Sequence, residues 1–311
     1  MSVPTPRTGA PSADDLLILL AVARFGRFTR AAESLGINHT TISRRLSVLE
    51  SQLGGRLLAR SSGSWELTDL GHEAFLAAEQ VETALNGLGP HPAGTSELRG
   101  LVRLSSTDGL SAYIVAPAVA EVQRTHPLLN VEIITATRRV LQHRSGLDIE
   151  IVVGKPQVHR AETLHLGDYV LGLYVSREYA ANRGIPTTQA ELASHPLVFY
   201  IDSMLHVDDL DSSRKSIPAG PSPLTSTNVF VHVEATRAGA GIGLLPCFMA
   251  DRHDDLVRVM PGEVAARLAF WLVGRPESMR REAVRAVVEA IRIRMEDARG
   301  ELLGIPSALG N

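Results

Sequence analysis

The stretch FTRAAESLGINHTTISRRLSVLESQLGGRLLARSSGSWELTDLG, residues 28–71, carries the helix and strand signals of the N-terminal part of the chain. Thr29 is a candidate cap for a short helix, RAAESL, and Gly36 offers the left-handed exit from it. Asn38 is a good cap for a further helix. That helix carries one narrow apolar stripe with spacings of 4, 3 and 4, which must face a core, at Ile42, Leu46, Leu49 and Leu53.

The opposite face of this third helix carries short polar side chains and a guanidinium. Thr40, Ser43, Arg44 and Ser47 share that face, with His39 at its leading edge. A major groove about 12 Å wide accepts a helix, and arginine can bind guanine through two hydrogen bonds. A solvated amphipathic helix is the alternative, since such a helix also has one polar face. A helix over 16–26, the short second helix and the turn at Gly36 favour a DNA-binding helix-turn-helix.

Two short strands follow, RLLAR and WEL, joined by SSGS with Gly63 in the turn. A hairpin directly after the third helix is a wing. Thr68 and Asp69 then cap a long helix with a heptad stripe of Leu70, Ala74, Ala77, Val81, Ala84 and Leu88. This stripe predicts a dimer that presents two recognition helices to two half-sites. Packing of the stripe on its own domain is the alternative.

The whole of residues 28–71 resembles the N-terminal signature of the LysR-type transcriptional regulators, ligand-responsive DNA-binding proteins of bacteria. The matching residues are Phe28, Thr29, Ala31, Ala32, Leu35, Ile42, Ser43, Arg44, Leu49, Glu50, Leu53, Gly54, Leu57, Arg60, Leu67, Thr68 and Gly71. The resemblance implies base-reading residues at His39, Thr40, Ser43 and Arg44, with DNA-backbone contacts from Arg30 and Arg60.

Two residues depart from the family pattern. His39 stands where the family often has Gln, so a different base preference is expected there, and Gly63 replaces the second arginine of the wing. We expect the wing to hold its phosphates less firmly.

The larger C-terminal part alternates strands and helices. After a Gly- and Pro-rich linker at 89–97, the runs LVRLSS, VEIITAT and DIEIVVG with intervening helices form a βαβαβ pattern, which predicts a largely parallel sheet. Further strands are expected at DYVLGLYVS, LVFYID and RLAFWLVG. This part resembles the effector-binding domain of the same family, in which two α/β subdomains related to periplasmic solute-binding proteins hold a ligand between them.

The resulting prediction is an α/β multi-domain protein. We expect a winged helix-turn-helix at 1–68, a linker helix for dimerisation with a hinge at 69–96, an effector-binding domain at 97–300 and a disordered tail at 301–311. The resemblance implies one subdomain made of 98–166 and 272–298 and a second made of 167–271.

Ligands of open α/β sheets lie beyond the carboxyl ends of the strands, where loops and helix N-termini offer free N–H groups. The polar residues at such positions are Ser106, Thr107, Thr137, Asp202 with Ser203, and Thr227 with Asn228. Each is also an ordinary cap or turn residue. Ser106 and Thr107, directly after the first strand, are the leading candidates for effector binding.

Composition excludes several classes of function. The 311 residues are 44% hydrophobic and 21% charged with a net charge of −3, as in ordinary globular proteins. Residues 1–70 contain eight arginines and six acidic residues, a balance that permits DNA binding. The single cysteine, Cys247, excludes an intramolecular disulfide, and we interpret it as a buried apolar residue. The sequence has no signal peptide and no membrane-spanning run, which predicts a cytoplasmic protein.

No chemistry is predicted. The histidines lack a metal-ligand spacing, no nucleophile stands with a base, and Gly239, Gly241 and Gly243 follow a helical pattern instead of the strand that a nucleotide-binding loop requires. We therefore expect no enzyme activity, metal or cofactor.

We expect a sequence-specific regulator whose promoter binding responds to a small molecule of unknown identity. The expected partners are double-stranded DNA, the effector and further copies of the chain, as a homodimer that assembles into a homotetramer; RNA polymerase is a candidate partner, and a membrane is not. Two alternatives stay open. In the first, the effector site has lost its ligand and serves only assembly. In the second, an enzyme or solute-binding module is fused to a vestigial DNA-binding domain.

Overall fold

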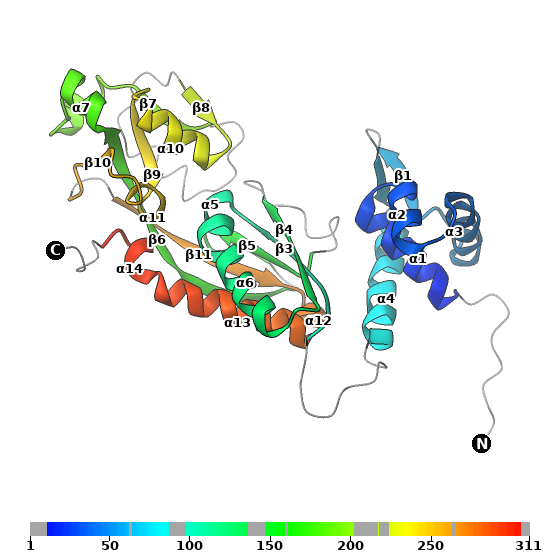
Figure 1. Cartoon of the computed structure of the whole chain (residues 1–311). Helices are drawn as coiled ribbons and strands as arrows, with labels where there is room; N and C mark the ends of the chain where they lie inside the picture. The colour runs from blue at the N-terminus through cyan, green and yellow to red at the C-terminus, as the bar shows by residue number, and fades with distance from the viewer. Residues whose placement is uncertain are drawn as a thin grey trace. The chain divides into compact units, whose positions relative to one another are not determined.

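The computed structural model describes residues 11–61, 64–86, 98–135, 147–158, 161–201, 217, 224–262 and 265–305. The chain divides into two compact units, one formed by residues 1–96 with 141–146 and the other by 97–140 with 147–311 (Figure 1). Among the helices in these ranges, none combines the length and apolar character that a membrane crossing needs.

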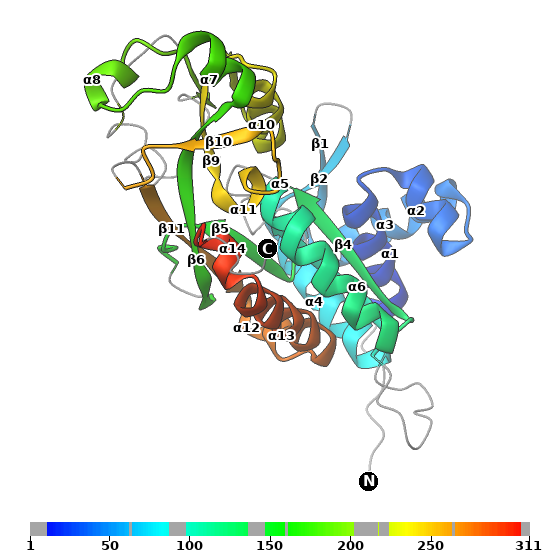
Figure 2. The same ribbon diagram turned by 60° about the vertical axis from the view of Figure 1, so that its left-hand side comes forward.

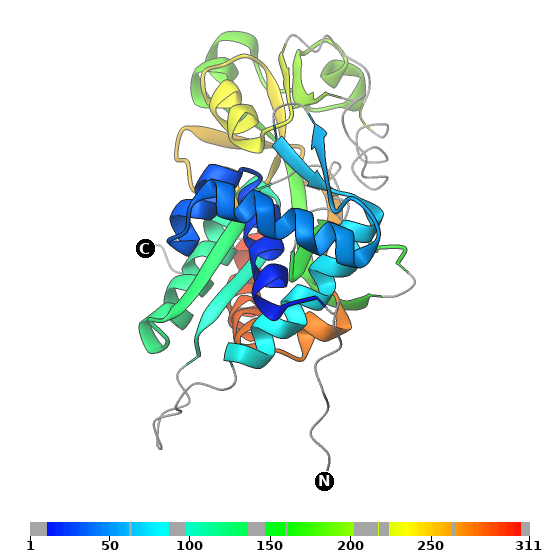
Figure 3. The same cartoon turned by 90° about the vertical axis from the view of Figure 1, so that its right-hand side faces the viewer.

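The first unit consists of three helices, a hairpin and a long helix. In chain order these are α1 (Ala13–Phe25), α2 (Phe28–Leu35), α3 (His39–Leu53), β1 (Leu58–Ser61), β2 (Ser64–Leu67) and α4 (Asp69–Asn86). Figure 3 shows this unit, coloured blue to cyan, with the hairpin extending beyond the helices. The winged helix-turn-helix predicted from the sequence is confirmed.

Glycines and short polar side chains set the helix ends. Gly26, Gly36 and Gly54 have φ angles of 64°, 64° and 78° and end α1, α2 and α3 in the left-handed conformation, which costs glycine little. Asn38 Oδ1 accepts a hydrogen bond from Thr40 N at 3.0 Å, as predicted. The prediction that Thr29 caps α2 is wrong, because the helix already begins at Phe28.

The apolar stripe of α3 faces the core. Ile42, Leu46 and Leu49 are buried and pack with Leu19 and Val22 of α1, while Leu53 is only half-buried at the end of the helix. Trp65 of the hairpin closes this core from the side. Its ring lies edge-on against Phe28 with 5.1 Å between the centroids.

The long helix α4 packs against α1. Ala74, Phe75 and Ala78 are buried at this contact, which Arg24 extends through two hydrogen bonds of 2.7 and 2.6 Å to the Glu82 carboxylate. The predicted heptad stripe is therefore divided: Ala74 packs within the unit, and Ala77 and Ala84 are exposed. Leu88 lies outside the described residues.

The second unit is a mixed sheet flanked by helices. Its elements are β3 (Gly100–Ser106), α5 (Asp108–Leu110), η1 (Ser111–Val115), α6 (Ala116–Thr125), β4 (Leu129–Thr135), β5 (Ile149–Val153), β6 (Glu162–Ser176), α7 (Arg177–Arg183), α8 (Gln189–Leu192), β7 (Leu197–Tyr200), β8 (Leu224–Ser226), α10 (Val229–Arg237), β9 (Ile242–Pro246), α11 (Cys247–Ala250), β10 (Leu256–Val259), β11 (Ala265–Gly274), α12 (Pro276–Met279), α13 (Glu282–Asp297) and α14 (Arg299–Leu302). Figure 2 shows α6 and α13 side by side on the sheet.

Two long strands join two lobes of this sheet. The strand order is β4-β3-β5-β11-β6-β9-β7-β8, with β10 also paired to β6. The strands β4, β3 and β5 of the first lobe run parallel, as do β9, β7 and β8 of the second, whereas β11 pairs antiparallel with both β5 and β6. The prediction of a largely parallel sheet thus holds for these two groups of three strands. It fails for β6 and β11, which cross between the lobes, because every pair that β6 makes with β9, β10 or β11 is antiparallel, as is the pair of β11 with β5.

A bulge marks this crossing. The register of β11 against β6 shifts between Phe270, opposite Gly167, and Trp271, opposite His165, which leaves Leu166 as the extra residue. A bulge bends its strand and increases the local twist. The sequence predicts the subdomain boundaries, 166/167 and 271/272, at this same place; the boundaries themselves stay a prediction.

The C-terminal end differs from the expected disordered tail. Helix α14 (Arg299–Leu302) continues past residue 300, and the Leu302 side chain is buried at 1% exposure against the core of the second unit. Residues 301–305 therefore belong to the folded unit, because an apolar contact holds them there; residues 306–311 lie outside the described residues.

We expect Leu302→Ala to lower the free energy of unfolding of the second unit by about 2 to 5 kcal/mol, because it leaves a cavity in the core. Ile305→Ala, at a side chain with 59% exposure, should change it by less than about 0.5 kcal/mol. Urea unfolding followed by the fluorescence of Trp271 in a Trp65→Phe background measures both. Equal, small losses would show that α14 is not part of the core.

Candidate DNA-binding surface and interlobe site

The polar face of α3 is turned away from the core of the first unit. His39, Thr40, Ser43 and Arg44 are all exposed, as the helical spacing predicts. Thr40 Oγ1 and Ser47 Oγ make local hydrogen bonds of 3.1 and 3.0 Å, to Asn38 Oδ1 and the Ser43 carbonyl oxygen. Small hydroxyls bonded to their own helix leave room for a close approach of another surface, and their oxygens keep acceptor capacity for it.

Two consecutive arginines of α3 have opposite roles. Arg45 Nε donates to Asp15 Oδ1 at 2.5 Å, and its guanidinium also pairs with Asp14 at 3.5 Å, which fastens α3 to α1. The hydrogen bond to Asp15 raises the pKa of Arg45 above its ordinary value. Within the described ranges Arg44 has no hydrogen-bonding or ionic partner. Its five N–H donors are available to an external acceptor.

Three further exposed arginines lack a partner among the residues that the structure describes. They are Arg27, Arg30 and Arg60. By contrast, Arg56 pairs with Glu50 at 3.3 Å. Four arginines of the first unit thus keep uncompensated charges on α2, α3 and the hairpin, an arrangement suited to phosphate and base acceptors.

Arg27 was not among the predicted site residues. It occupies the cap position of α2 with an extended backbone and makes no side-chain capping bond, so the first N–H groups of α2 are uncapped by a side chain. A helix start with free N–H groups and a positive charge beside it attracts anions. Gly26 is the sequence signal for this position. It ends α1 in the left-handed conformation, so Arg27 stands at the start of α2.

The hairpin is tied to a residue between α1 and α2 at a point close to its turn. Trp65 N donates to the Gly26 carbonyl oxygen at 3.1 Å, and Arg60 lies opposite Trp65 in the strand register. The wing arginine is therefore carried by a strand that packing holds in place. Gly63, at which the sequence predicts a weakened wing, lies outside the described residues.

Ser106 and Thr107 lie at the carboxyl end of β3, as predicted. Ser106 is fully buried and its Oγ has no hydrogen-bond partner among the described residues, while Thr107 precedes α5 without a side-chain capping bond. The helical run from Asp108 to Thr125 contains a turn of π-helix at Ser111–Val115, where Ser111 Oγ is likewise buried and unpartnered. Buried polar groups without partners are rare, and π-turns are frequent at functional sites.

The facing element of the second lobe is α10. Its cap, Asn228, accepts a hydrogen bond from Phe230 N at 2.8 Å, and α10 packs against α5 of the first lobe. Tyr113 of η1 lies 6.1 Å from Phe230 between ring centroids. Thr227 is half-buried just before α10. The elements that carry Ser106, Thr107 and Thr227 are thus brought together, whereas Thr137, Asp202 and Ser203 lie outside the described residues.

Sequence reasoning missed His232 and Tyr200 on the second lobe. His232 is buried, its Nε2 donates to the Ser226 carbonyl oxygen at 2.9 Å, and its Nδ1 has no partner in the described part of the chain. Burial lowers the pKa of His232, so the ring is neutral and Nδ1 is an unused acceptor. No periodicity distinguishes such a histidine from its apolar neighbours in VFVHVEA.

Tyr200 ends β7, and its ring lies 4.4 Å from the His232 ring between centroids. Burial raises the pKa of the Tyr200 hydroxyl, and the charge of Asp108 raises it further. Because Asp108 belongs to α5, the two lobes bring an acid, a phenol and an unpartnered imidazole nitrogen into one region. These groups are suited to hydrogen bonding with a polar ligand.

The described residues contain no group of three or more His, Cys, Asp or Glu side chains that could hold a metal ion. Cys247 is buried, and burial raises the pKa of its thiol, which lowers the fraction of reactive thiolate.

Two family models match the chain. The model of the LysR substrate binding domain matches residues 95–296, and that of the bacterial regulatory helix-turn-helix protein of the lysR family matches residues 13–72. The two matches cover both units of the structure in the order predicted from the sequence.

Curated relatives match over most of their length. The chain is 26% identical over 266 residues to the Mau operon transcriptional activator of Paracoccus denitrificans, which covers 85% of this chain and 89% of that protein. It is 28% identical over 292 residues to the HTH-type transcriptional activator TtdR of Escherichia coli, with coverages of 90% and 92%.

Solved structures show the same fold. A full-length OxyR variant from Pseudomonas aeruginosa superposes with a TM-score of 0.68 at 19% identity, covering 91% of this chain and 98% of that one. ArgP from Mycobacterium tuberculosis superposes with a TM-score of 0.64 at 19% identity, with coverages of 90% and 96%. The chain belongs to the LysR family of transcriptional regulators, with a helix-turn-helix DNA-binding domain followed by an effector-binding domain.

Proposed function

We propose that this regulator reads promoter DNA through α3. Arg44 contacts a base, His39, Thr40 and Ser43 contribute to the same readout, and Arg27, Arg30 and Arg60 bind phosphates on either side. The observation that carries this assignment is the contrast between Arg45, bonded to Asp15 at 2.5 Å, and Arg44, which has no partner within the described residues. A guanidinium that does not stabilise its own domain is available for DNA.

A small-molecule effector bound between the two lobes controls this DNA binding. Ser106, Thr107 and Thr227 are its proposed contacts, with His232 and Tyr200 as contacts added by the structure; Thr137 and Asp202 stay predictions from the sequence. The buried, unpartnered Ser106 Oγ supports this site, because a bound polar ligand would supply the missing hydrogen bond.

The remaining assignments concern oligomeric assembly, catalysis, cellular location and a protein partner. The exposed residues Ala77 and Ala84 of α4 support a homodimer in which two α4 helices pack closely, and such dimers pair into a tetramer. The protein performs no catalysis, acts in the cytoplasm where its DNA target lies, and contacts RNA polymerase at the promoter.

Arg44→Ala should weaken binding to specific DNA by about 1 to 3 kcal/mol and change binding to random DNA little, because a base contact is lost. Fluorescence anisotropy with a DNA fragment from upstream of the regulator's own gene, and with the same fragment shuffled, measures this difference. Arg285→Ala, an exposed arginine of α13, is the matched control. Equal losses on both fragments would assign Arg44 to phosphate.

Arg27→Ala and Arg60→Ala should each weaken binding to every sequence. Each removed phosphate contact should reduce the slope of log affinity against log salt concentration by about 0.9. Titrations at several salt concentrations give the slope. An unchanged slope for either variant removes that arginine from the interface.

The double variant Ser106→Ala with Thr107→Ala should lose most of the stabilisation given by an effector found in a metabolite screen by thermal shift. The unliganded variant should stay folded, since the Ser106 hydroxyl has no partner to lose. At 100 times its dissociation constant, an effector stabilises the parent protein by about 2.7 kcal/mol. Full stabilisation of the double variant would place the effector elsewhere, and Ser51→Ala, on the exposed surface of α3, serves as the control.

A further inference from the structure

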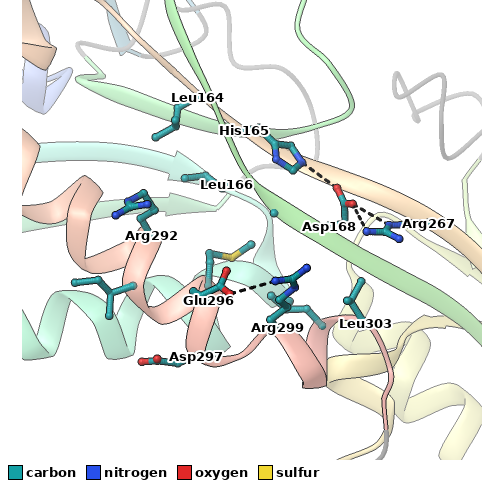
Figure 4. A pocket seen from close by; sticks show the side chains of 14 residues that line it. Leu164, His165, Leu166, Asp168, Arg267, Arg292, Glu296, Asp297, Arg299 and Leu303 are labelled. Atoms are coloured by element: carbon teal, nitrogen blue, oxygen red, sulfur yellow. Dashed lines mark hydrogen bonds and ion pairs between the residues drawn. The ribbon is translucent and has the colours of Figure 1, made fainter.

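The second unit contains a pocket separate from the interlobe site. It has a volume of about 600 Å³ and lies between β6, at the strand crossing, and the C-terminal helices α13 and α14 (Figure 4). None of the residues proposed to bind the effector lines it. The pocket is of the size that drug-sized ligands occupy.

The floor of the pocket is apolar. Leu166, the extra residue of the bulge, lies there with Met295 and Leu302, and all three side chains are buried. The apolar surface continues to the mouth, where Leu164 and Ile293 are 36% and 54% exposed. Exposed aliphatic side chains beside a hollow favour an apolar ligand body, because its binding would remove them from water.

Two of the three acidic groups that line the pocket, Asp168 and Glu296, already have partners. Asp168 accepts from Arg267 Nε at 2.8 Å through one oxygen and contacts His165 Nε2 at 2.9 Å through the other. Burial would raise the pKa of Asp168, but the hydrogen bonds from His165 and Arg267 outweigh it, and the pKa is lowered. Glu296 pairs with Arg299 at 3.3 Å. Figure 4 shows the Asp297 carboxylate on the outer side of α13, away from the β6 residues.

The basic groups have capacity to spare. A guanidinium carries five N–H donors, and the bonds to Asp168 and Glu296 use only some of those of Arg267 and Arg299. Figure 4 shows these two side chains reaching the mouth from opposite walls, one from β11 and one from α14. The Arg299–Glu296 pair is largely exposed, so it exchanges its partner at little cost. The Arg267 guanidinium is exposed as well, and the half-buried Asp168 beside it also keeps its contact with His165.

We propose that this pocket is a second small-molecule site that binds an amphipathic carboxylate. The apolar body lies over Leu166, Met295 and Leu302, and the carboxylate accepts hydrogen bonds from Arg267 and Arg299. A ligand there touches both sides of the bulge at which β6 passes between the lobes, and it also touches the C-terminal helices. The site is independent of the proposed DNA contacts and of the effector contacts between the lobes.

Three probes with one apolar skeleton test the proposal: 4-phenylbutyrate, 4-phenyl-1-butanol and 4-phenylbutylamine. Isothermal titration of the full chain should show the carboxylate binding more tightly than the alcohol, with the amine weakest. Arg267→Gln with Arg299→Gln should weaken the carboxylate about tenfold, since charge-assisted hydrogen bonds are lost, and should leave the alcohol unchanged. Arg285→Gln, at an exposed arginine of α13 outside the pocket, should change neither.

A second variant separates this pocket from the interlobe site. The double variant Ser106→Ala with Thr107→Ala should bind 4-phenylbutyrate like the parent protein. Four results would each overturn the proposal. The first two are loss of 4-phenylbutyrate binding in this variant and unchanged binding in Arg267→Gln with Arg299→Gln. The other two are amine binding as tight as carboxylate binding, and no detectable binding of 4-phenylbutyrate at about 10 mM, since weak ligands have dissociation constants of about 1 mM.

Discussion

The contact between Arg45 and Asp15 is the interaction on which the DNA-binding surface depends. Asp15 is buried in the first turn of α1, and its carboxylate requires a charged partner there. Since Arg45 supplies that partner from α3, the rotation of α3 about its axis is set by an ion pair as well as by Ile42, Leu46 and Leu49. Arg44, about 100° further round the helix, must then point outward. One buried acid thus decides which of two adjacent arginines is structural and which is available to DNA.

A different constraint governs the second unit. Its two lobes share β6 and β11, so neither lobe can move without bending these strands near the bulge between Phe270 and Trp271. The interlobe site lies where α5 and α10 meet, and the pocket beneath α13 and α14 lies at the crossing itself. A ligand at either proposed site would act on the same two strands. Such a construction would let a regulator combine two chemical signals in one change of lobe position.

The sequence was sufficient where spacing and turn chemistry act locally. The stripe of Ile42, Leu46 and Leu49, the exit at Gly36 and the cap at Asn38 are enough to specify α3 and its exposed face. Ser106 was placed correctly because a polar residue after an apolar strand ends that strand. Neither inference requires information about distant parts of the chain.

Predictions that depend on distant contacts were incomplete or wrong. The heptad stripe of α4 predicts one dimer-forming face, with packing on its own domain as the alternative. In the structure both apply to parts of the helix, because Ala74, Phe75 and Ala78 are buried within the first unit while Ala77 and Ala84 are exposed. The burial of Leu302 depends on a core assembled from many strands, so composition alone indicated a tail. The missing partner of His232 Nδ1 is a property of the packed lobe, and the pocket above Met295 forms from segments over a hundred residues apart in the chain.

Hydrogen–deuterium exchange of the full chain, with and without DNA from upstream of its own gene, shows whether the exposed face of α3 binds DNA. DNA binding should slow exchange in peptides that cover α2, α3 and the hairpin, and should not change it in peptides that cover α13. Saturating DNA that leaves exchange in α2, α3 and the hairpin unchanged would contradict DNA binding by this face.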